Sequence, residues 1–176
     1  RKNLLSIVKA LPLLHKDVTL PLVVIGDGAA YKDTVKNHLA AAGISNLVVF
    51  MSENKAARSE KGFRTAADFP AIYQQATAMI YPSTFEGFGI PVLEALWSRI
   101  LVITSNVSCL PEAGGPGAFY VDPLSPEQIA AAMTRIVTDA PAVQQSIATG
   151  YLHAQRFTRK ACAEAVMNVY REVMSQ

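Results

Sequence analysis

Residues 78–97 constrain the fold more than any other stretch, because they read as a strand, a glycine-bearing loop and a helix in succession. The apolar run at 78–81 is cut off by Pro82, as happens at the end of a buried strand. From Ile90 onward apolar residues return at helical spacing, and Pro91 stands near the first turn, where a helix tolerates proline. A strand that feeds directly into a helix is the repeating unit of α/β proteins.

The same alternation runs along the rest of the chain. Helices are predicted at 3–16, 31–42, 69–76 and 125–137, and short apolar strands at 20–25, 46–51, 78–81, 100–104 and 118–121. After 137 the pattern is helical to the end, with interruptions predicted near Gly150 and Phe157. The sequence therefore predicts the α/β class with a doubly wound, Rossmann-like parallel sheet, in which ligands bind at the carboxyl ends of the strands.

Composition narrows the class of partner. The chain has 176 residues, enough for one domain with a sizeable core, so 1–176 is read as one ligand-binding unit. It is 51% hydrophobic and 17% charged, as expected of buried parallel strands. A net charge of +2 does not favour nucleic acid, and no apolar run is long enough to span a membrane. The chain starts at Arg1, without a methionine, and is read as a fragment of something longer.

No metal site is predicted. Cys109 and Cys162 stand far apart and are interpreted as two reduced, buried thiols of a cytosolic protein. Neither has metal-ligand spacing with the other or with a histidine. The Gly26-Asp27-Gly28 loop resembles a dinucleotide fingerprint, but the third glycine would fall on Tyr31. It is better read as a strand-to-helix turn near a ligand cleft.

The loop after residue 81 contains the candidate ligand-binding residues. A helix N-terminus attracts anions, and Gly87 and Gly89 would let a phosphate approach the backbone. Glu86 and Glu94 are acceptors for hydroxyl groups, so a ligand with a central phosphate and hydroxyls at both ends, such as a nucleotide-sugar, would fit. The residues alone leave a plainer alternative open: Glu86 as a helix-capping acid and Glu94 as a solvated surface acid.

The stretch EGFGIPVLEA resembles the Glu-x7-Glu motif of retaining, family-4-type glycosyltransferases (glycosyl transferases group 1) in the C-terminal, donor-binding half of their GT-B fold. The similarity extends to other blocks in the same order: RKN at the start, VVIGDG at 23–28, DFPAIYQQA at 68–76, SCLPEAGG at 108–115 and YVDP at 120–123. In that family a central strand precedes the helix that begins near RKN. Either a longer polypeptide supplies it, or the sheet has a gap.

The resemblance implies a role for each matching residue. It assigns Glu86 to the hydroxyls of the transferred sugar as the catalytic residue, and Glu94 to the ribose. It assigns the donor sugar and diphosphate to Lys2, Gly87, Phe88, Gly89 and Ile90. It implies no metal and no cofactor, the nucleotide diphosphate sugar being a substrate. Whether Glu86 also acts as a nucleophile stays open. For this family we favour departure of the leaving group from the front face, in which the leaving phosphate itself helps to deprotonate the acceptor.

The implied function is retaining transfer of a sugar from a nucleotide diphosphate sugar to a saccharide, lipid or other acceptor. The acceptor would bind mainly in an N-terminal domain absent from this chain, so the fragment alone is expected to be inactive. The implied location is cytoplasmic, free or at the inner face of the membrane. Two alternatives remain: a non-catalytic nucleotide-sugar-binding module of the same fold, and a sugar-nucleotide epimerase of similar architecture.

Two segments depart from the family pattern. Residues 52–67 form a longer polar segment, read as a mobile loop or as a flap near the nucleotide base or an anionic acceptor. Arg99 stands where glycine is usual, and it costs free energy there if the turn requires a positive φ. Trp97 beside it is read as a core or interface residue rather than a sugar platform.

Overall fold

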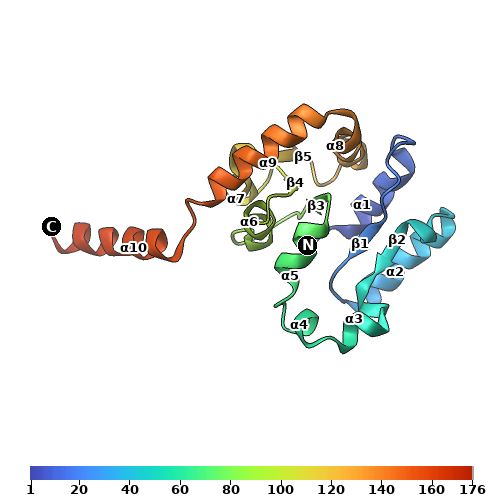
Figure 1. Ribbon diagram of the computed structural model, residues 1–176, viewed down its shortest axis with the longest axis horizontal. Coiled ribbons are helices and arrows are strands. Elements are labelled where there is room, and N and C mark those ends of the chain that lie inside the picture. The colour runs from blue at the N-terminus through green and yellow to red at the C-terminus, as the bar shows by residue number, and fades with distance from the viewer. Residues whose placement is uncertain (176) are drawn as a thin grey trace.

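The computed structural model describes residues 1–175, and its strands form two parallel sheets flanked by helices (Figure 1). The strands are β1 (Leu22–Val24), β2 (Val48–Phe50), β3 (Ala78–Tyr81), β4 (Leu101–Ser105) and β5 (Ala118–Val121). One sheet has the order β1-β2 and the other the order β3-β4-β5. All pairs are parallel, with Tyr81 opposite Thr104 and Ser105 opposite Val121. The predicted parallel α/β arrangement is confirmed.

The helices follow the strands in alternation. They are α1 (Leu4–Ala10), α2 (Ala29–Ala41), α3 (Lys55–Ser59), α4 (Lys61–Arg64), α5 (Phe69–Gln75), α6 (Ile90–Trp97), α7 (Leu110–Gly114), α8 (Pro126–Thr138), α9 (Ala140–Ala154) and α10 (Arg159–Met174). Short 3-10 turns are η1 (Leu11–Leu13), η2 (Ser45–Leu47), η3 (Met51–Glu53) and η4 (Gly115–Gly117).

Both faces of the three-stranded sheet are buried, as double winding requires. Leu101 and Ile103 of β4 pack into a core with residues of α1, α2 and α8, whereas Val102 packs into a second core with residues of α6 and α7. The alternation follows from the strand period of two, which sends neighbouring side chains to opposite faces. Every residue of β4 is buried, which explains the apolar run Leu101–Ile103 with which the strand begins.

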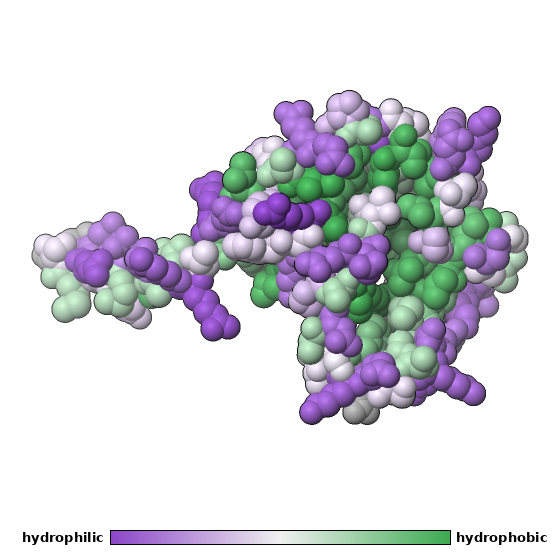
Figure 2. Space-filling view, viewed as in Figure 1, coloured by the Kyte–Doolittle hydropathy of each residue, from purple (hydrophilic) through white to green (hydrophobic). Residues whose placement is uncertain are grey.

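The strands of the described residues do not form one continuous sheet. Among the described residues, β1 and β3 are not paired with each other, although one core connects residues of both sheets. Val23 in β1 is 49% exposed, unusual for an apolar residue of a parallel strand. Apolar surface gathers between the two sheets in Figure 2. The break between the two sheets therefore lies between β1 and β3.

Most element boundaries agree with the sequence pattern to within two or three residues. Strands β3 and β5 lie at the predicted residues, and the Ser125 side chain caps α8 by accepting a hydrogen bond from the amide of Gln128. The break predicted near Gly150 is wrong, because α9 runs through it. Gly150 is buried against Gly117, where a Cβ on Gly117 would lie 2.0 Å from the Gly150 Cα. This glycine serves close packing rather than helix termination.

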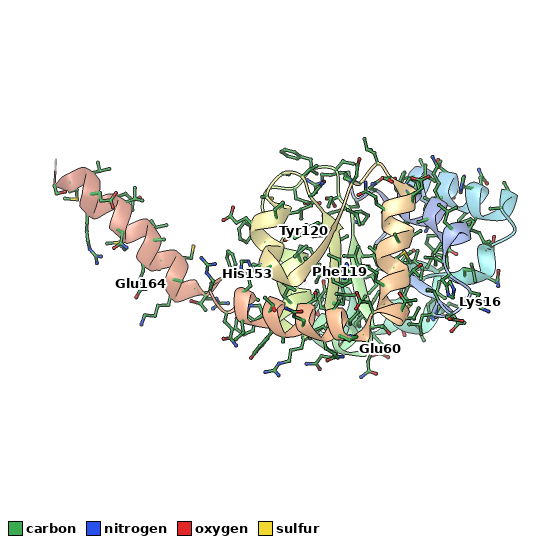
Figure 3. The ribbon with its side chains drawn as sticks, turned by 90° about the horizontal axis from the view of Figure 1, so that it is seen from above. Lys16, Glu60, Phe119, Tyr120, His153 and Glu164 are labelled. Atoms are coloured by element: carbon green, nitrogen blue, oxygen red, sulfur yellow. The ribbon has the colours of Figure 1, made fainter. Side chains whose placement is uncertain are left out.

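Helix α10 projects from the body as an arm, with Glu164 on its side (Figures 1 and 3). Thr158 caps it by accepting from the Ala161 amide, and none of its described residues is buried. Cys162 is exposed, so the prediction that it is buried is wrong, whereas Cys109 is partly buried. Within residues 1–175 no helix combines the length and apolar character needed to cross a membrane.

Candidate functional site

Glu86 lies in the loop that follows β3, and its side chain is only 8% exposed. Its Oε1 accepts hydrogen bonds from the Lys2 ammonium at 2.7 Å and from the Tyr81 hydroxyl at 3.0 Å. Lys2 also donates to the Tyr81 hydroxyl. The fold thereby joins residues 84 positions apart in the chain. Of the predicted site residues, Lys2 and Glu86 are in direct contact.

The electrostatics of this contact keep Glu86 ionised. Burial raises the pKa of the carboxyl, but hydrogen bonds from Lys2 and Tyr81 together with the Lys2 charge outweigh it, and the pKa lies below its ordinary value of 4.5. The Ser83 hydroxyl also lowers the pKa of Glu86, although the geometry of this hydroxyl gives it no hydrogen-bond partner among the described residues. Burial lowers the pKa of Lys2. The hydrogen bonds of Lys2 to Glu86 and Tyr81 raise this pKa by more than burial lowers it, so the net shift is upward.

The backbone of Glu86 is anchored separately, from the segment after β4. The Ser108 hydroxyl donates to the Glu86 carbonyl at 2.8 Å, and the Cys109 thiol donates to the same oxygen at 3.2 Å. Ser108 has φ 60°, an uncommon conformation for a residue other than glycine. Sequence reasoning missed Tyr81, Ser108 and Cys109 as neighbours of Glu86. Only the SCLPEAGG block pointed to the second segment, and a motif match does not show which atoms meet.

The N-terminus of α6 has no side-chain cap. Gly89 precedes the helix with φ 98°. Among the described residues, the amides of Gly87, Phe88, Gly89 and Ile90 have no hydrogen-bond acceptor. Unpaired amides at a helix N-terminus bind phosphate well, because they add donors to the positive end of the helix dipole.

The four residues differ in what their side chains do. Gly89 is buried, and a Cβ there would lie 2.9 Å from Leu110 Cδ2. A Cβ on Gly87, in contrast, would meet nothing within 4 Å, so its surface faces open space. Phe88 packs edge to face on Phe157 at 5.5 Å and thus offers a ligand its backbone rather than its ring. Ile90 is 61% exposed beside the open amides.

Glu94 lies one helical turn further along α6, where it is exposed. Its Oε2 accepts a hydrogen bond from the Tyr73 hydroxyl of α5 at 3.1 Å. Burial and the nearby Glu94 carboxylate raise the pKa of Tyr73 well above its ordinary value, so the tyrosine acts as a donor. No contact joins Glu94 to Glu86 among the described residues, so the structure places the two acids in separate hydrogen-bonded groups.

An open cavity of about 770 Å³ lies beyond the ends of β1 and β2. Its lining consists of Ile25, Gly26, Asp27, Lys32, Ser52, Glu53, Arg58, Phe63 and Phe69. Asp27 follows β1 in the predicted strand-to-helix turn and pairs with Lys32 at 2.9 Å. Phe69 contacts Tyr73 edge to face on α5, with ring centroids 6.5 Å apart, and so links the cavity to the tyrosine that holds Glu94.

The polar segment 52–67 contains regular structure, so the prediction of a loop over these residues is wrong. It folds into the short helices α3 and α4, and the Asn54 side chain caps α3 by accepting from the Ala57 amide. Arg58 and Phe63 from these helices line the cavity. The alternative interpretation, a flap over a ligand site, agrees with this position.

The arginine at the end of α6 does adopt the conformation that favours glycine. Arg99 has φ 58°, and its guanidinium carbon lies 3.9 Å from the centroid of the Tyr151 ring. A cation stacked on an aromatic face is stabilised by the ring quadrupole, which offsets part of the backbone strain. Trp97 contacts the same ring edge to face at 5.8 Å and is 42% exposed.

The described residues contain no cluster of three or more His, Cys, Asp or Glu side chains that could hold a metal ion. The available groups are instead carboxylates, an ammonium and backbone amides. The chain is a Rossmann-like α/β domain in which these groups lie at the carboxyl end of β3, an edge strand of the three-stranded sheet, beside the uncapped N-terminus of α6. The carboxyl ends of the strands are the usual ligand position in this class, and unpaired helix amides suit an anion.

The particular family follows from comparison with known proteins. Residues 1–153 match the family model described as Glycosyl transferases group 1, so the chain belongs to this family. It is 28% identical over 174 residues to O-antigen chain mannosyltransferase B of Escherichia coli, and 29% identical over 168 residues to the D-inositol 3-phosphate glycosyltransferase of Streptomyces griseus. These matches cover 97% and 93% of this chain but 43% and 34% of the relatives, so the chain spans less than half of their length.

Solved structures show the same fold. The C-terminal domain of the glycosyl transferase group 1 family protein LpcC from Francisella tularensis has a TM-score of 0.72 at 23% identity, over 88% of this chain and 78% of that one. Anabaena Alr3699/HepE, in complex with UDP and glucose, has a TM-score of 0.77 at 18% identity, over 95% of this chain and 44% of that one. The prediction of the C-terminal half of a GT-B fold is confirmed.

Proposed function

We propose that this chain supplies the donor site of a retaining glycosyltransferase that uses a nucleotide diphosphate sugar. The observation that carries the proposal is the buried Glu86 carboxylate, paired with Lys2, directly before the open amides at the start of α6. This arrangement offers a hydroxyl acceptor and a set of anion donors side by side. A sugar attached to a phosphate needs both.

The diphosphate would lie on the amides of Gly87 to Ile90 with Lys2 beside it. When the bond between the sugar C1 and the phosphate oxygen breaks, negative charge grows on the diphosphate. Donors fixed before the reaction stabilise that charge without having to reorganise. Glu86 would hold hydroxyls of the transferred sugar, because an ionised carboxylate only accepts hydrogen bonds.

For a retaining reaction, we propose that the acceptor oxygen forms its bond to C1 on the face from which the diphosphate departs. The acceptor's proton passes to the departing phosphate oxygen, so atoms and charges balance without an added base. In this scheme Glu86 orients the sugar and forms no covalent bond. Glu86→Gln keeps the shape but removes the charge, and transfer should fall more than donor binding does.

The nucleoside would extend from the α6 N-terminus past Glu94 toward the cavity beyond β1 and β2. Glu94 would accept from the ribose hydroxyls, since its second carboxylate oxygen has no partner among the described residues. Phe63 and Phe69 give the cavity aromatic walls that suit a planar base. The path from Phe69 through Tyr73 to Glu94 supports this order of base, ribose and phosphate.

Relatives resemble this chain over only part of their length, and two of them are named a mannosyltransferase and an inositol-phosphate glycosyltransferase. We propose that the acceptor binds in the region those relatives have beyond the matched part. The acceptor is taken to be a saccharide, a lipid or another hydroxyl-bearing group, and reaction at the inner face of a membrane is consistent with either of the first two.

A binding titration tests the proposal. The full-length protein is titrated with UDP, GDP and ADP and with their sugars, then compared with the Glu94→Ala and Lys2→Met variants. Selective binding of one diphosphate, weakened about tenfold by each change, supports the donor site. Glu172→Ala and Lys9→Met, at exposed positions of α10 and α1, are matched controls and should bind as the parent does. A folded protein that binds none of these nucleotides would contradict the proposal.

A further inference from the structure

Tyr81 is the last residue of β3, and its backbone is fixed. It lies opposite Thr104 in the parallel pair with β4, and the buried Thr104 hydroxyl donates to the Tyr81 carbonyl at 2.9 Å. From this position the Tyr81 hydroxyl reaches Glu86 Oε1 at 3.0 Å. Within the described residues, that hydroxyl contacts Glu86 and Lys2 and no other polar group.

Lys2 is held by the same tyrosine. Its ammonium lies 4.5 Å from the centroid of the Tyr81 ring, within the range of cation–π attraction. The proposed function also assigns the charge of Lys2 to the diphosphate. The Lys2 side chain is 50% exposed, so it can turn toward a ligand more easily than Glu86, whose side chain is 8% exposed.

This difference creates a requirement at the moment the donor binds. If Lys2 turns to the diphosphate, the poorly exposed Glu86 carboxylate loses its only cationic partner among the described residues. A carboxylate left without a donor in such a place is costly, and it is free to rotate away from the sugar. A hydroxyl that stays on Oε1 removes both problems and leaves Oε2 free for a sugar hydroxyl.

We propose that Tyr81 is a positioning residue that holds the Glu86 carboxylate toward the transferred sugar while Lys2 changes partner from Glu86 to the diphosphate. Its ring supports the Lys2 ammonium before donor binding, and its hydroxyl remains on Glu86 afterwards. The inference rests on the proposed function, since it assumes that a diphosphate competes for Lys2. Ser108 and Cys109 complete the arrangement by fixing the Glu86 backbone.

The test is Tyr81→Phe in the full-length protein, because this change removes the hydroxyl and keeps the ring. With the donor bound by the amides and Lys2, the KM for the donor should change less than twofold, whereas kcat should fall about tenfold for the loss of one hydrogen bond to a charged group. The acidic limb of the kcat profile should also move to higher pH, because Glu86 loses a donor that favours its ionised form.

Tyr120→Phe is the matched control. Tyr120 (labelled in Figure 3) lies on β5, two strands from Tyr81 in the same sheet, and its hydroxyl donates to the Gly115 carbonyl at 2.6 Å. Among the described residues it makes no hydrogen bond to Glu86 or Lys2. Burial raises its pKa to about 12. Its substitution should lower the unfolding midpoint and leave both kcat and the pH profile unchanged. A merely structural role for Tyr81 would give the same pattern as this control and would overturn the inference.

A second measurement separates this inference from the proposed function. The pKa of the Glu86 carboxyl can be followed by nuclear magnetic resonance in the ligand-free protein. A higher value in Tyr81→Phe supports the inference even if no donor is found, whereas an unchanged value overturns it. If the parent protein transfers sugar and Tyr81→Phe matches it in kcat and pH profile, the inference fails and the donor site stands.

Discussion

The two glycines of the site loop should respond in opposite ways to the addition of one methyl group. Both were predicted to let a phosphate approach the backbone, but the structure separates them. Gly89 has φ 98°, and its added Cβ would lie 2.9 Å from Leu110 Cδ2 and 3.2 Å from the Ala113 Cβ. Gly87 has no such φ, and its added Cβ would face open space.

The expected magnitude for Gly89→Ala follows from these contacts. A left-handed backbone costs alanine about 1–2 kcal/mol, and overpacking against a fully buried leucine adds about 1–2 kcal/mol more. The free energy of unfolding should therefore fall by about 2–4 kcal/mol, a large part of the roughly 5–15 kcal/mol of an ordinary domain. Gly87→Ala should change it by less than about 0.5 kcal/mol, as at other open surface positions.

Denaturant unfolding of both variants without ligand measures these changes, and titration with the selected nucleotide diphosphate sugar measures binding. Gly87→Ala should keep its stability and bind the donor about tenfold more weakly, because its methyl group occupies the space of the phosphate. A fully stable Gly89→Ala would refute the strain and packing argument. A Gly87→Ala variant that binds normally would show that the diphosphate does not approach this amide.

Three further outcomes are expected. Arg99→Gly should change the unfolding free energy by less than about 1 kcal/mol, because the relief of backbone strain is offset by the loss of stacking on Tyr151. In a Tyr151→Leu background, where there is no stacking to lose, the same change should stabilise the protein by about 1 kcal/mol. Equal effects in both backgrounds would contradict the stacking. The Glu86 pKa is lowered, so its contribution to stability is complete above the ordinary pKa of 4.5 and is lost as the pH falls through the lower folded value. Unfolding measured between pH 6 and about pH 2 should show a shallower acid loss in Lys2→Met, and identical curves would exclude the ion pair. Glu94→Gln should weaken binding of a ribonucleoside diphosphate about tenfold and that of the 2′,3′-dideoxy analogue hardly at all; equal losses would rule out the ribose contact.

Local sequence decided much of the architecture. The apolar run at 78–81 before Pro82 predicted a strand, which the structure confirms as the partly buried β3, and Ser125 followed by proline predicted the start of a helix. The spacing of Glu86 and Glu94 around a glycine-bearing loop, together with the family resemblance of the surrounding stretch, predicted where the proposed donor site lies. Each of these features depends on residues that are close together in the chain, so the sequence pattern is sufficient to predict it.

Contacts between distant segments decided the rest. Gly150 reads as a helix breaker, yet α9 continues because Gly117 packs against it. The segment 52–67 reads as a loop, yet it forms two short helices over the cavity. The pairing of parallel strands likewise depends on which edges meet, and the division between β1 and β3 is visible only once they are placed.

The site itself shows the same limit. The sequence identified Glu86 and, through the family resemblance, Lys2, but it did not show that Tyr81 binds both or that Ser108 and Cys109 fix the Glu86 backbone. Hydrogen bonds form between atoms about 3 Å apart, and the distance between two side chains depends on how strands and loops pack. The local order of strand, loop and helix was therefore determined by the sequence alone, whereas the partners of the central carboxylate were decided by the tertiary structure.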